Sequence, residues 1–345
     1  MNAHYLTGQV NTIVGTIPQI STVWSGQDLW NTIKVRWSVG RMDYKVEPGI
    51  YAVGNPGESS LVFVTANFKL TFDHVRRALG GMDAWLLVLD TKGINVWCAA
   101  GKGTFSTKEL VRQINLVGLE KIVNHHKVIV PQLGAVGVSA HEIRKNTGFS
   151  VIYGPVRAED ILDFVEAGMK ATKEMRAVKF STWDRLKLIP VEMGNGRKYL
   201  LLIPAIFLIL SGLNPKGYSI DMAYHDGLRS VFNLLIAYVT GCGITPALLP
   251  WIPFRRFALK GLLTGWLAAF ILAYFHFLGK TNFEIISWFL MIGSLSSFLA
   301  MTFTGTSTFT SLSGVQKEMK TAVPMQIGMA GLGVIAWIVS KFITL

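Results

Sequence analysis

The sequence predicts an α/β domain with a largely parallel, Rossmann-like sheet, followed by an all-helical transmembrane domain of about five helices. Up to about residue 190, short and continuously apolar β-rich segments alternate with helical patterns, which is typical of strands buried on both faces of a parallel sheet. From Tyr199 onward, long apolar runs dominate. The chain of 345 residues is 50% hydrophobic and 16% charged, which is too apolar for an ordinary soluble protein.

The elements of the first part follow in a regular order. The predicted strands are 50–54, 61–66, 84–90, 94–97, 127–131 and 150–154, and the predicted helices are 71–81, 107–126 and 158–175. Ligands of such sheets bind outside the carboxyl ends of the strands, so functional residues are expected in the loops there. The chain accordingly divides into a domain over 1–165, a basic juxtamembrane linker over 166–198 and a transmembrane domain over 199–345.

Five apolar runs approach the roughly 20 residues that a membrane-spanning helix needs. The first run is short and contains Pro204, but it could span by thinning the bilayer locally. No series of carboxylates such as a proton-coupled transporter uses is visible in these runs. The predicted spans are about 199–213, 229–249, 258–278, 283–303 and 322–344.

Basic residues predict the orientation in the membrane. Eight of them precede the apolar half, where anionic lipid attracts positive charge and positive charge resists translocation. No secretory signal is visible over residues 1–20. We therefore expect a multi-pass protein of the inner (cytoplasmic) membrane with its N-terminal domain in the cytoplasm, and we attribute the net charge of +12 to lipid contact rather than to nucleic acid. The basic residues are Lys170, Lys173, Arg176, Lys179, Arg185, Lys187, Arg197 and Lys198, then Arg255, Arg256, Lys317 and Lys320 in the expected inside loops.

The segment 94-INVWCAAGKGTFSTKEL-110 contains Cys98, one of only two cysteines. Residues 94–97 are predicted as a short strand, and Ser106 with Glu109 predicts a capping box at the start of the next helix. Cys98 is then expected in a turn or short helix, where unpaired backbone N–H groups favour a thiolate. The small residues around it leave room for a large, flat molecule.

Three kinds of chemistry compete for this segment. A phosphate-binding loop is excluded because it needs glycine at 96 and a hydroxyl residue at 103, where Val96 and Gly103 stand. A soft metal ligand presented to a flat cofactor remains open, as does a metal-binding or purely packing role for Cys242 in the second span. A catalytic cysteine–histidine pair has no support from spacing; the nearby histidines are His125, His126 and His141.

The residues 95-NVWCAAGK-102 resemble the signature of the mercury-methylating corrinoid protein family, HgcA. That signature reads Asn, Val or Ile, Trp, Cys, Ala or Ser, Ala or Gly, Gly, Lys, and all eight positions match. The five predicted spans also fit this family. Four further segments are similar to the corrinoid-binding domain of the corrinoid iron–sulfur protein of the acetyl-CoA pathway: 47–56, 61–73, 131–143 and 150–161.

The resemblance implies a corrinoid-dependent methyltransferase that passes a methyl group from a cobalamin-type corrinoid to Hg(II), forming methylmercury. Cys98 would be the catalytic residue and the lower axial ligand of cobalt. A thiolate there donates electron density, which favours departure of the methyl group as a carbanion or radical equivalent, as the electrophile Hg(II) requires. The other residues implied around the corrinoid are Asn95, Val96, Trp97, Ala99, Ala100, Gly101, Lys102 and Gly103 in the cap, Thr65, Asn67 and Thr71 facing the ring, and Gly134, Gly137, Val138, Tyr153, Gly154 and Pro155 at its edge or nucleotide tail.

The resemblance also implies partners, because two cysteines cannot hold an iron–sulfur cluster. These are a ferredoxin with two 4Fe–4S clusters, HgcB, as electron donor and Hg(II) carrier, and a methyltetrahydrofolate-linked methyl donor. Two other functions stay open. One is a corrinoid methyl carrier for another soft acceptor, such as arsenic or a thiol; the other is a membrane transporter with a regulatory cytoplasmic domain.

Overall fold

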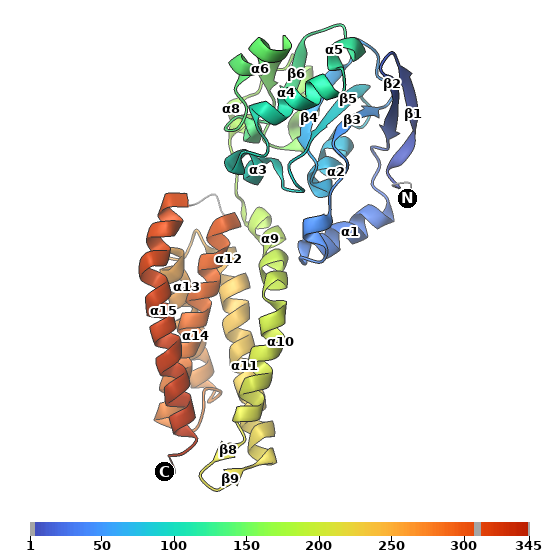
Figure 1. Ribbon diagram of the computed structural model, residues 1–345. Helices are drawn as coiled ribbons and strands as arrows, with labels where there is room; N and C mark the ends of the chain where they lie inside the picture. The colour runs from blue at the N-terminus through green and yellow to red at the C-terminus, as the bar shows by residue number, and fades with distance from the viewer. Residues whose placement is uncertain (1–3, 307–311, 344–345) are drawn as a thin grey trace. The chain divides into compact units, whose positions relative to one another are not determined.

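The computed structural model describes residues 4–306 and 312–343. The chain forms two compact units (Figure 1). The first consists of residues 1–35 with 40–178, and the second of residues 36–39 with 179–345. Each unit is described by itself.

The first unit is built on a seven-stranded sheet in the order β1-β2-β3-β5-β4-β6-β7. Four of its six strand pairings are parallel, which confirms the predicted α/β class with a largely parallel sheet. β3 and β5 pair antiparallel, as do β1 and β2. The strands are β1 (Leu6–Thr12), β2 (Gly15–Ile20), β3 (Gly49–Val53), β4 (Leu61–Ala66), β5 (Ala84–Leu89), β6 (Lys127–Val130) and β7 (Ser150–Tyr153).

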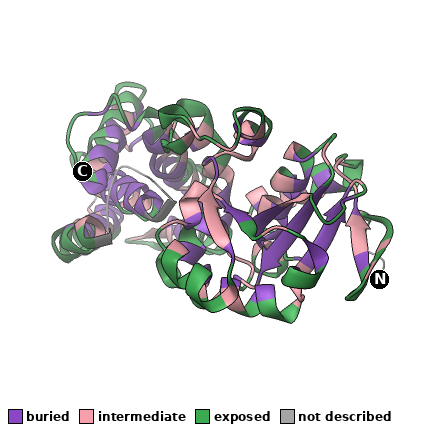
Figure 2. Ribbon diagram, turned by 90° about the horizontal axis from the view of Figure 1, so that it is seen from above, coloured by how far each residue is buried: buried purple, intermediate pink, exposed green. Residues whose placement is uncertain are grey.

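Helices cover both faces of this sheet, and its central strands β3, β4, β5 and β6 are mostly buried (Figure 2). Along β5 the side chains alternate: Trp85, Leu87 and Leu89 enter one apolar core, and Leu86 and Val88 enter the other. The first core contains α3 to α6, and the second contains α2 and α7. The helices are α1 (Gly26–Arg36), η1 (Arg41–Asp43), α2 (Lys69–Ala78), α3 (Val96–Lys102), α4 (Thr107–Leu116), α5 (Leu119–Ile122), η2 (Gln132–Gly134), α6 (Ala140–Thr147), η3 (Ala158–Asp160), α7 (Ile161–Glu166) and α8 (Lys173–Arg176).

The predicted strand over 94–97 is wrong. Asn95 caps a helix that begins at Val96, because its side-chain oxygen accepts a hydrogen bond from the Cys98 backbone N–H at 2.9 Å. The apolar Ile-Asn-Val-Trp run imitates a strand, but Asn at its second position favours a helix start. Cys98 therefore lies within the first turn of α3.

Two predicted helices are interrupted. The helix expected over 107–126 ends at Leu116, and α5 starts after Gly118, whose φ of 62° is incompatible with a continuing helix. The helix expected over 158–175 is divided among η3, α7 and α8. The other five predicted strands are confirmed to within a residue, whereas β1, β2 and α1 were not predicted.

The second unit is helical and contains four helices that are long and apolar enough to cross a membrane. A bent pair, α9 and α10, passes the same test together with a bend of 56°, which gives up to five spans in the described part of the chain. The prediction of about five apolar helices is thus supported, with the first span broken at Gly196. The elements are α9 (Thr182–Asn195), α10 (Arg197–Leu210), β8 (Leu213–Asn214), β9 (Gly217–Tyr218), α11 (Ile220–Val239), the π-helix η4 (Thr240–Ile244), α12 (Thr245–Leu248), α13 (Phe257–Tyr274), α14 (Asn282–Thr302), η5 (Phe303–Thr306) and α15 (Leu312–Ser340).

Several boundaries in this unit differ from the prediction. The segment 166–198, expected as a linker, contains α8 and α9, and α9 begins with a capping box at Ser181. The second span begins at Ile220 rather than 229, and α15 begins at Leu312 rather than 322. Polar side chains near these helix starts obscure them in a hydropathy profile. Part of the inside loop expected over 304–321, residues 307–311, lies outside the described residues.

Candidate functional site

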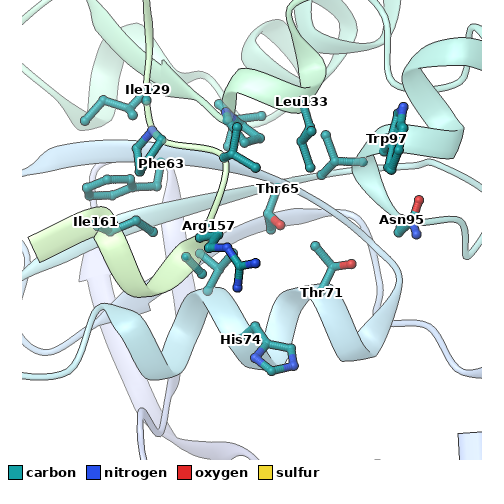
Figure 3. A pocket seen from close by; sticks show the side chains of 18 residues that line it. Phe63, Thr65, Thr71, His74, Asn95, Trp97, Ile129, Leu133, Arg157 and Ile161 are labelled. Carbon is teal, nitrogen blue, oxygen red and sulfur yellow. The ribbon is translucent and has the colours of Figure 1, made fainter. Parts of the chain in front are cut away.

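A cavity of about 290 Å³ lies in the first unit at the carboxyl ends of β4, β6 and β7 (Figure 3). β4 leads into α2 on one face of the sheet, whereas β6 leads to α6 on the other. Such a change of direction opens a crevice at the strand ends, where ligands of α/β sheets bind. The cavity is lined by Phe63, Val64, Thr65, Thr71, His74, Val75, Asn95, Val96, Trp97, Ile129, Pro131, Leu133, Gly154, Pro155, Val156, Arg157, Ala158 and Ile161.

The hydroxyl of Thr65 is a buried polar group that faces this cavity. Thr65 is fully buried near the end of β4, and among the described residues its Oγ1 has no hydrogen-bond partner. An unpaired buried hydroxyl costs about 1–3 kcal/mol. A ligand with a polar edge would offset that cost.

The remaining polar side chains of the wall come from α2 and from the loop after β7. Thr71 and His74 lie one turn apart on the same face of α2, and Figure 3 shows them together with Arg157 and Thr65 around the cavity. Arg157 also pairs with Glu159 at 3.1 Å near the surface. Guanidinium groups bind phosphate and carboxylate groups in a bidentate manner, so Arg157 suits an anionic portion of a ligand.

Helix α3 closes another side of the cavity. Asn95, Val96 and Trp97 line it, and Trp97 is 42% exposed. Cys98 follows directly and is exposed, but it does not line the cavity. Its thiol thus lies on the outer surface of α3, beside the residues that form the wall.

The remaining residues of the expected corrinoid cap, 99–103, include both buried and exposed positions. Ala99 and Ala100 are buried and pack into the core beneath α3. Gly101 has open space where a Cβ would be, and Lys102 is exposed. Gly103 ends the helix in the left-handed conformation. The exposed surface of α3 beside Cys98 therefore carries the side chains of Trp97 and Lys102, with open space only at Gly101.

Four residues that we expected at the corrinoid edge lie behind α3 and do not line the cavity. A Cβ on Gly137 would be 2.1 Å from the Phe105 carbonyl oxygen, and one on Gly134 would be 2.4 Å from the Phe105 ring. Val138 is buried, and its carbonyl accepts a hydrogen bond from the Tyr153 hydroxyl at 2.6 Å. These residues allow the η2 loop to pack closely against α3. Gly154 and Pro155 do line the cavity.

Asn67 is also absent from the cavity wall. Its Oδ1 accepts hydrogen bonds from the backbone N–H of Thr91 at 3.1 Å and of Gly93 at 3.0 Å. Its Nδ2 donates to Asp90 at 3.2 Å. Asn67 therefore fixes the turn between β5 and α3, and in this way it fixes where α3 begins.

Glu109 supports the same turn, and the predicted capping box is only half formed. Ser106 accepts from the Glu109 backbone N–H at 3.4 Å, but the Glu109 carboxylate accepts from the Asp90 backbone N–H at 2.9 Å instead of returning to Ser106. Burial raises the pKa of Glu109, but hydrogen bonds from Arg112 and Asp90 outweigh this and lower the pKa below its ordinary value. The carboxylate thus stays ionised and holds the turn.

Sequence reasoning missed the two cavity residues that can carry positive charge, His74 and Arg157. His74 could have been found because it lies three residues after Thr71 on a predicted helix. Arg157 follows Gly154-Pro155 after a predicted strand end, where ligand-binding loops occur. The apolar floor, formed by residues such as Phe63 and Ile161, has no distinguishing signal because these residues resemble ordinary core.

Residues 35–165 match the family model of the CO dehydrogenase/acetyl-CoA synthase delta subunit. This stretch is similar to a domain of that subunit. It includes every residue that lines the cavity. Residues 179–345, which make up most of the second unit, lie outside the match.

Curated proteins are similar to the same part of the chain. The gamma subunit of the acetyl-CoA decarbonylase/synthase complex of Archaeoglobus fulgidus is 35% identical over 39% of the chain, and the match covers 29% of that protein. The corrinoid/iron-sulfur protein large subunit of Moorella thermoacetica is 33% identical over 36% of the chain, covering 28% of that protein. The corresponding gamma subunit of Methanocaldococcus jannaschii is 30% identical over 41% of the chain, covering 30% of that protein. The chain thus spans about three tenths of the length of these relatives.

Proposed function

We propose that the chain is a membrane-anchored, corrinoid-dependent methyltransferase that methylates Hg(II). The observation that carries the proposal is the position of 95-NVWCAAGK-102: Asn95 and Trp97 line the cavity while Cys98 is exposed beside them. The domain match supports corrinoid binding, because one relative is named a corrinoid/iron-sulfur protein. The acceptor Hg(II) rests on the resemblance of the α3 sequence to the mercury-methylating family.

The residues of the cavity suit a corrinoid. A corrin ring is apolar on its faces and carries amide side chains at its edge, and the nucleotide tail of a cobalamin contains a phosphodiester. The unpaired Thr65 hydroxyl can accept from an amide N–H, and Arg157 can pair with the phosphodiester. A corrin is wider than a 290 Å³ cavity, so an edge or tail would enter it while the ring lies against α3.

Cys98 would hold the cobalt of a bound corrinoid through its sulfur. When bound, the corrinoid supplies a cobalt-bound methyl group for transfer. Hg(II) is an electron-pair acceptor, so it takes the methyl group together with the bonding electrons. The thiolate of Cys98 favours that outcome by donating charge toward the metal, and the capped first turn of α3 holds its backbone in place.

Electrons to restore the cofactor must come from a partner. Of the two cysteines, Cys98 is exposed on α3 and Cys242 is buried in the π-helix η4. Within the described residues, no three His, Cys, Asp or Glu side chains are grouped to hold a metal ion. We propose a ferredoxin with two 4Fe–4S clusters as reductant and Hg(II) carrier, and a methyltetrahydrofolate-linked methyl donor.

The second unit is proposed as a multi-pass anchor in the cytoplasmic membrane. Its four to five apolar helices are compatible with this role. The basic residues before Arg197 and at Arg255 and Arg256 support an orientation with the first unit in the cytoplasm.

An anaerobic assay tests this function. Purified protein is loaded with methylated corrinoid, Hg(II) is added, and methylmercury is quantified for the native chain, Cys98→Ala and Cys242→Ala. The second variant is the matched control, because it removes a thiol that lies in the other unit. We expect equal product from the native chain and Cys242→Ala and none above background from Cys98→Ala.

Two outcomes would favour other functions. A protein that holds methylated corrinoid but yields no methylmercury, while methylating arsenite or a thiol, would be a carrier for another soft acceptor. A protein that binds no corrinoid, and whose Cys98→Ala variant still moves a labelled solute into vesicles, would be a transporter.

A further inference from the structure

Helix α1 carries an apolar face that is at least half exposed in the part of the chain that the structure describes. Its opposite face packs inward through Asp28, Thr32 and Val35, which are all buried. The outward face presents three large apolar side chains, and their exposed fractions are Leu29 53%, Trp30 60% and Ile33 50%.

Basic residues lie on both sides of this apolar face. At 100° per residue, Leu29, Trp30 and Ile33 cover an arc of about 100°, and Lys34 and Arg36 lie at its two edges. A short helix with Trp and aliphatic residues on one face and cations beside them is typical of a helix that lies in a membrane interface. The stem of Lys34 can follow the apolar surface while its charge reaches the headgroups. Arg36 instead donates to the Lys187 carbonyl at 3.2 Å.

The segments before and after α1 also expose large apolar side chains. Val23, before the helix, is 74% exposed, and Met42, after it, is 75% exposed. Exposed apolar residues concentrated in one stretch mark an interaction site, whereas single ones are ordinary. Leu116, at the end of α4, is an example of the ordinary kind and is 69% exposed.

Chain continuity indicates that the partner is lipid. α1 ends at Arg36, and residues 36–39 belong to the unit that contains the candidate membrane spans. There, the Ser38 hydroxyl donates to the Val191 carbonyl at 3.1 Å, close to the bend between α9 and α10. A helix that continues directly into a membrane-inserted unit is kept near the bilayer by chain connectivity, and the cation Lys34 beside its apolar face matches anionic headgroups.

We propose that α1 lies in the headgroup layer of the bilayer with Leu29, Trp30 and Ile33 directed into the lipid. The inference rests on insertion of the second unit in a membrane but not on the chemistry of the first. It also has a consequence for the cavity. Asp28 on the buried face of α1 pairs with Arg76 of α2 at 2.9 Å, and α2 carries Thr71 and His74 of the cavity wall. The lipid surface thereby orients one wall of the cofactor cavity.

Site-directed spin labelling of the full chain in liposomes tests the proposal. The background carries Cys98→Ser and Cys242→Ser, and a nitroxide is attached at Ile33→Cys or Trp30→Cys on the apolar face. Gln27→Cys on the polar edge of α1 and Leu116→Cys on α4 are the controls. The liposomes contain phosphatidylcholine with a minor fraction of phosphatidylglycerol, and collision rates are measured with oxygen and with a water-soluble nickel chelate.

We expect the labels at 33 and 30 to collide more with oxygen than with nickel, at a depth of about 5–10 Å. The labels at 27 and 116 should collide mainly with nickel. Nickel access at 33 and 30 equal to that at 116 would overturn the proposal. Low nickel access at 33 and 30 would also overturn the proposal if the labels showed spin–spin broadening that increased with the amount of protein per liposome. That result would mean that the apolar face of α1 contacts a second copy of the chain. The measurement uses no corrinoid and no mercury, so its failure is distinguishable from failure of the proposed function.

Discussion

Cys98 and Thr65 are two residues of the first unit whose side-chain groups point to contact with a ligand. Cys98 is exposed on α3 beside the cavity wall, and the Thr65 hydroxyl lines the cavity without a hydrogen-bond partner among the described residues. A ligand that contacts both would account for the exposed thiol and for the unpaired hydroxyl. Each gives a prediction that does not depend on the other.

Replacing Cys98 by histidine separates ligation from methyl transfer. We expect Cys98→His to retain corrinoid and to lose most methylmercury formation, because a neutral imidazole donates less charge to cobalt than a thiolate. Corrinoid content is measured by absorbance and product by chromatography, with Cys242→Ala as control. Full activity in Cys98→His would contradict the thiolate argument.

Replacing Thr65 by valine keeps the shape of the side chain and removes its hydroxyl. Without ligand we expect equal or greater stability, by up to about 1 kcal/mol, because a buried unpaired group is lost. The corrinoid dissociation constant should rise about tenfold, which is roughly the contribution of one hydrogen bond. Thermal unfolding and a binding titration measure the two quantities.

Thr91→Val is the matched control for that experiment. The Thr91 hydroxyl is also buried, but it is hydrogen bonded to Asn67 at 2.8 Å and to the Ile94 carbonyl at 2.6 Å. Its loss should destabilise the unliganded protein by about 1–2 kcal/mol. Unchanged corrinoid affinity in Thr65→Val would remove Thr65 from the site.

At the scale of elements, three separate sets of interactions fix the position of α3. Asn95 caps it, Asn67 and Glu109 fix the turn before it, and the η2 loop packs against its back through Gly137. These supports involve residues far apart in the sequence. The conformation of the segment 95–102 therefore depends on residues outside that segment.

Two glycine substitutions separate contact with the cofactor from support of α3. Gly101→Ala places a Cβ in open space inside a helix, so the unliganded protein should gain about 0.5–1 kcal/mol while corrinoid affinity falls. Gly137→Ala places a Cβ 2.1 Å from the Phe105 oxygen and should destabilise the fold by about 1–3 kcal/mol. Unfolding midpoints and corrinoid titrations distinguish them; undiminished affinity in Gly101→Ala would show that the cofactor does not approach this position.

The contact between α1 and α2 gives a pH-dependent prediction. Burial raises the pKa of Asp28, but hydrogen bonds from His4, Ser25 and Arg76 outweigh it and hold the pKa well below its ordinary value. A carboxyl whose pKa is lowered by folding stabilises the protein above its unfolded pKa, near 4, and this stabilisation is lost as the pH falls through the folded pKa. Asp28→Asn should therefore cost about 3–5 kcal/mol at neutral pH and progressively less below about pH 4.

The exposed Glu142 of α6 provides the control, since Glu142→Gln makes the same chemical change at the surface. Its melting temperature should follow that of the native chain at every pH. A difference between Asp28→Asn and the native chain that stays constant down to strongly acid pH would contradict the account of the ionic cluster.

At the scale of the whole molecule, sequence patterns predicted the α/β class and the apolar helices, because these depend on periodicity within single segments. They failed where distant residues decide the outcome. The strand expected at 94–97 became a helix start, and the roles of Asn67, Gly134 and Gly137 became visible only when the chain brought them to α3. His74 and Arg157 were missed because each is ordinary in its own segment and meets the others only at the cavity.

The central claim is that Cys98 ligates the cobalt of a bound corrinoid, and X-ray absorption at the cobalt edge tests it most directly. The full chain is loaded anaerobically with corrinoid, and the native protein, Cys98→Ala and Cys242→Ala are compared. The account predicts a sulfur neighbour of cobalt in the native chain and in Cys242→Ala, and its absence in Cys98→Ala. A native spectrum with only nitrogen and oxygen neighbours, identical to that of Cys98→Ala, would contradict it.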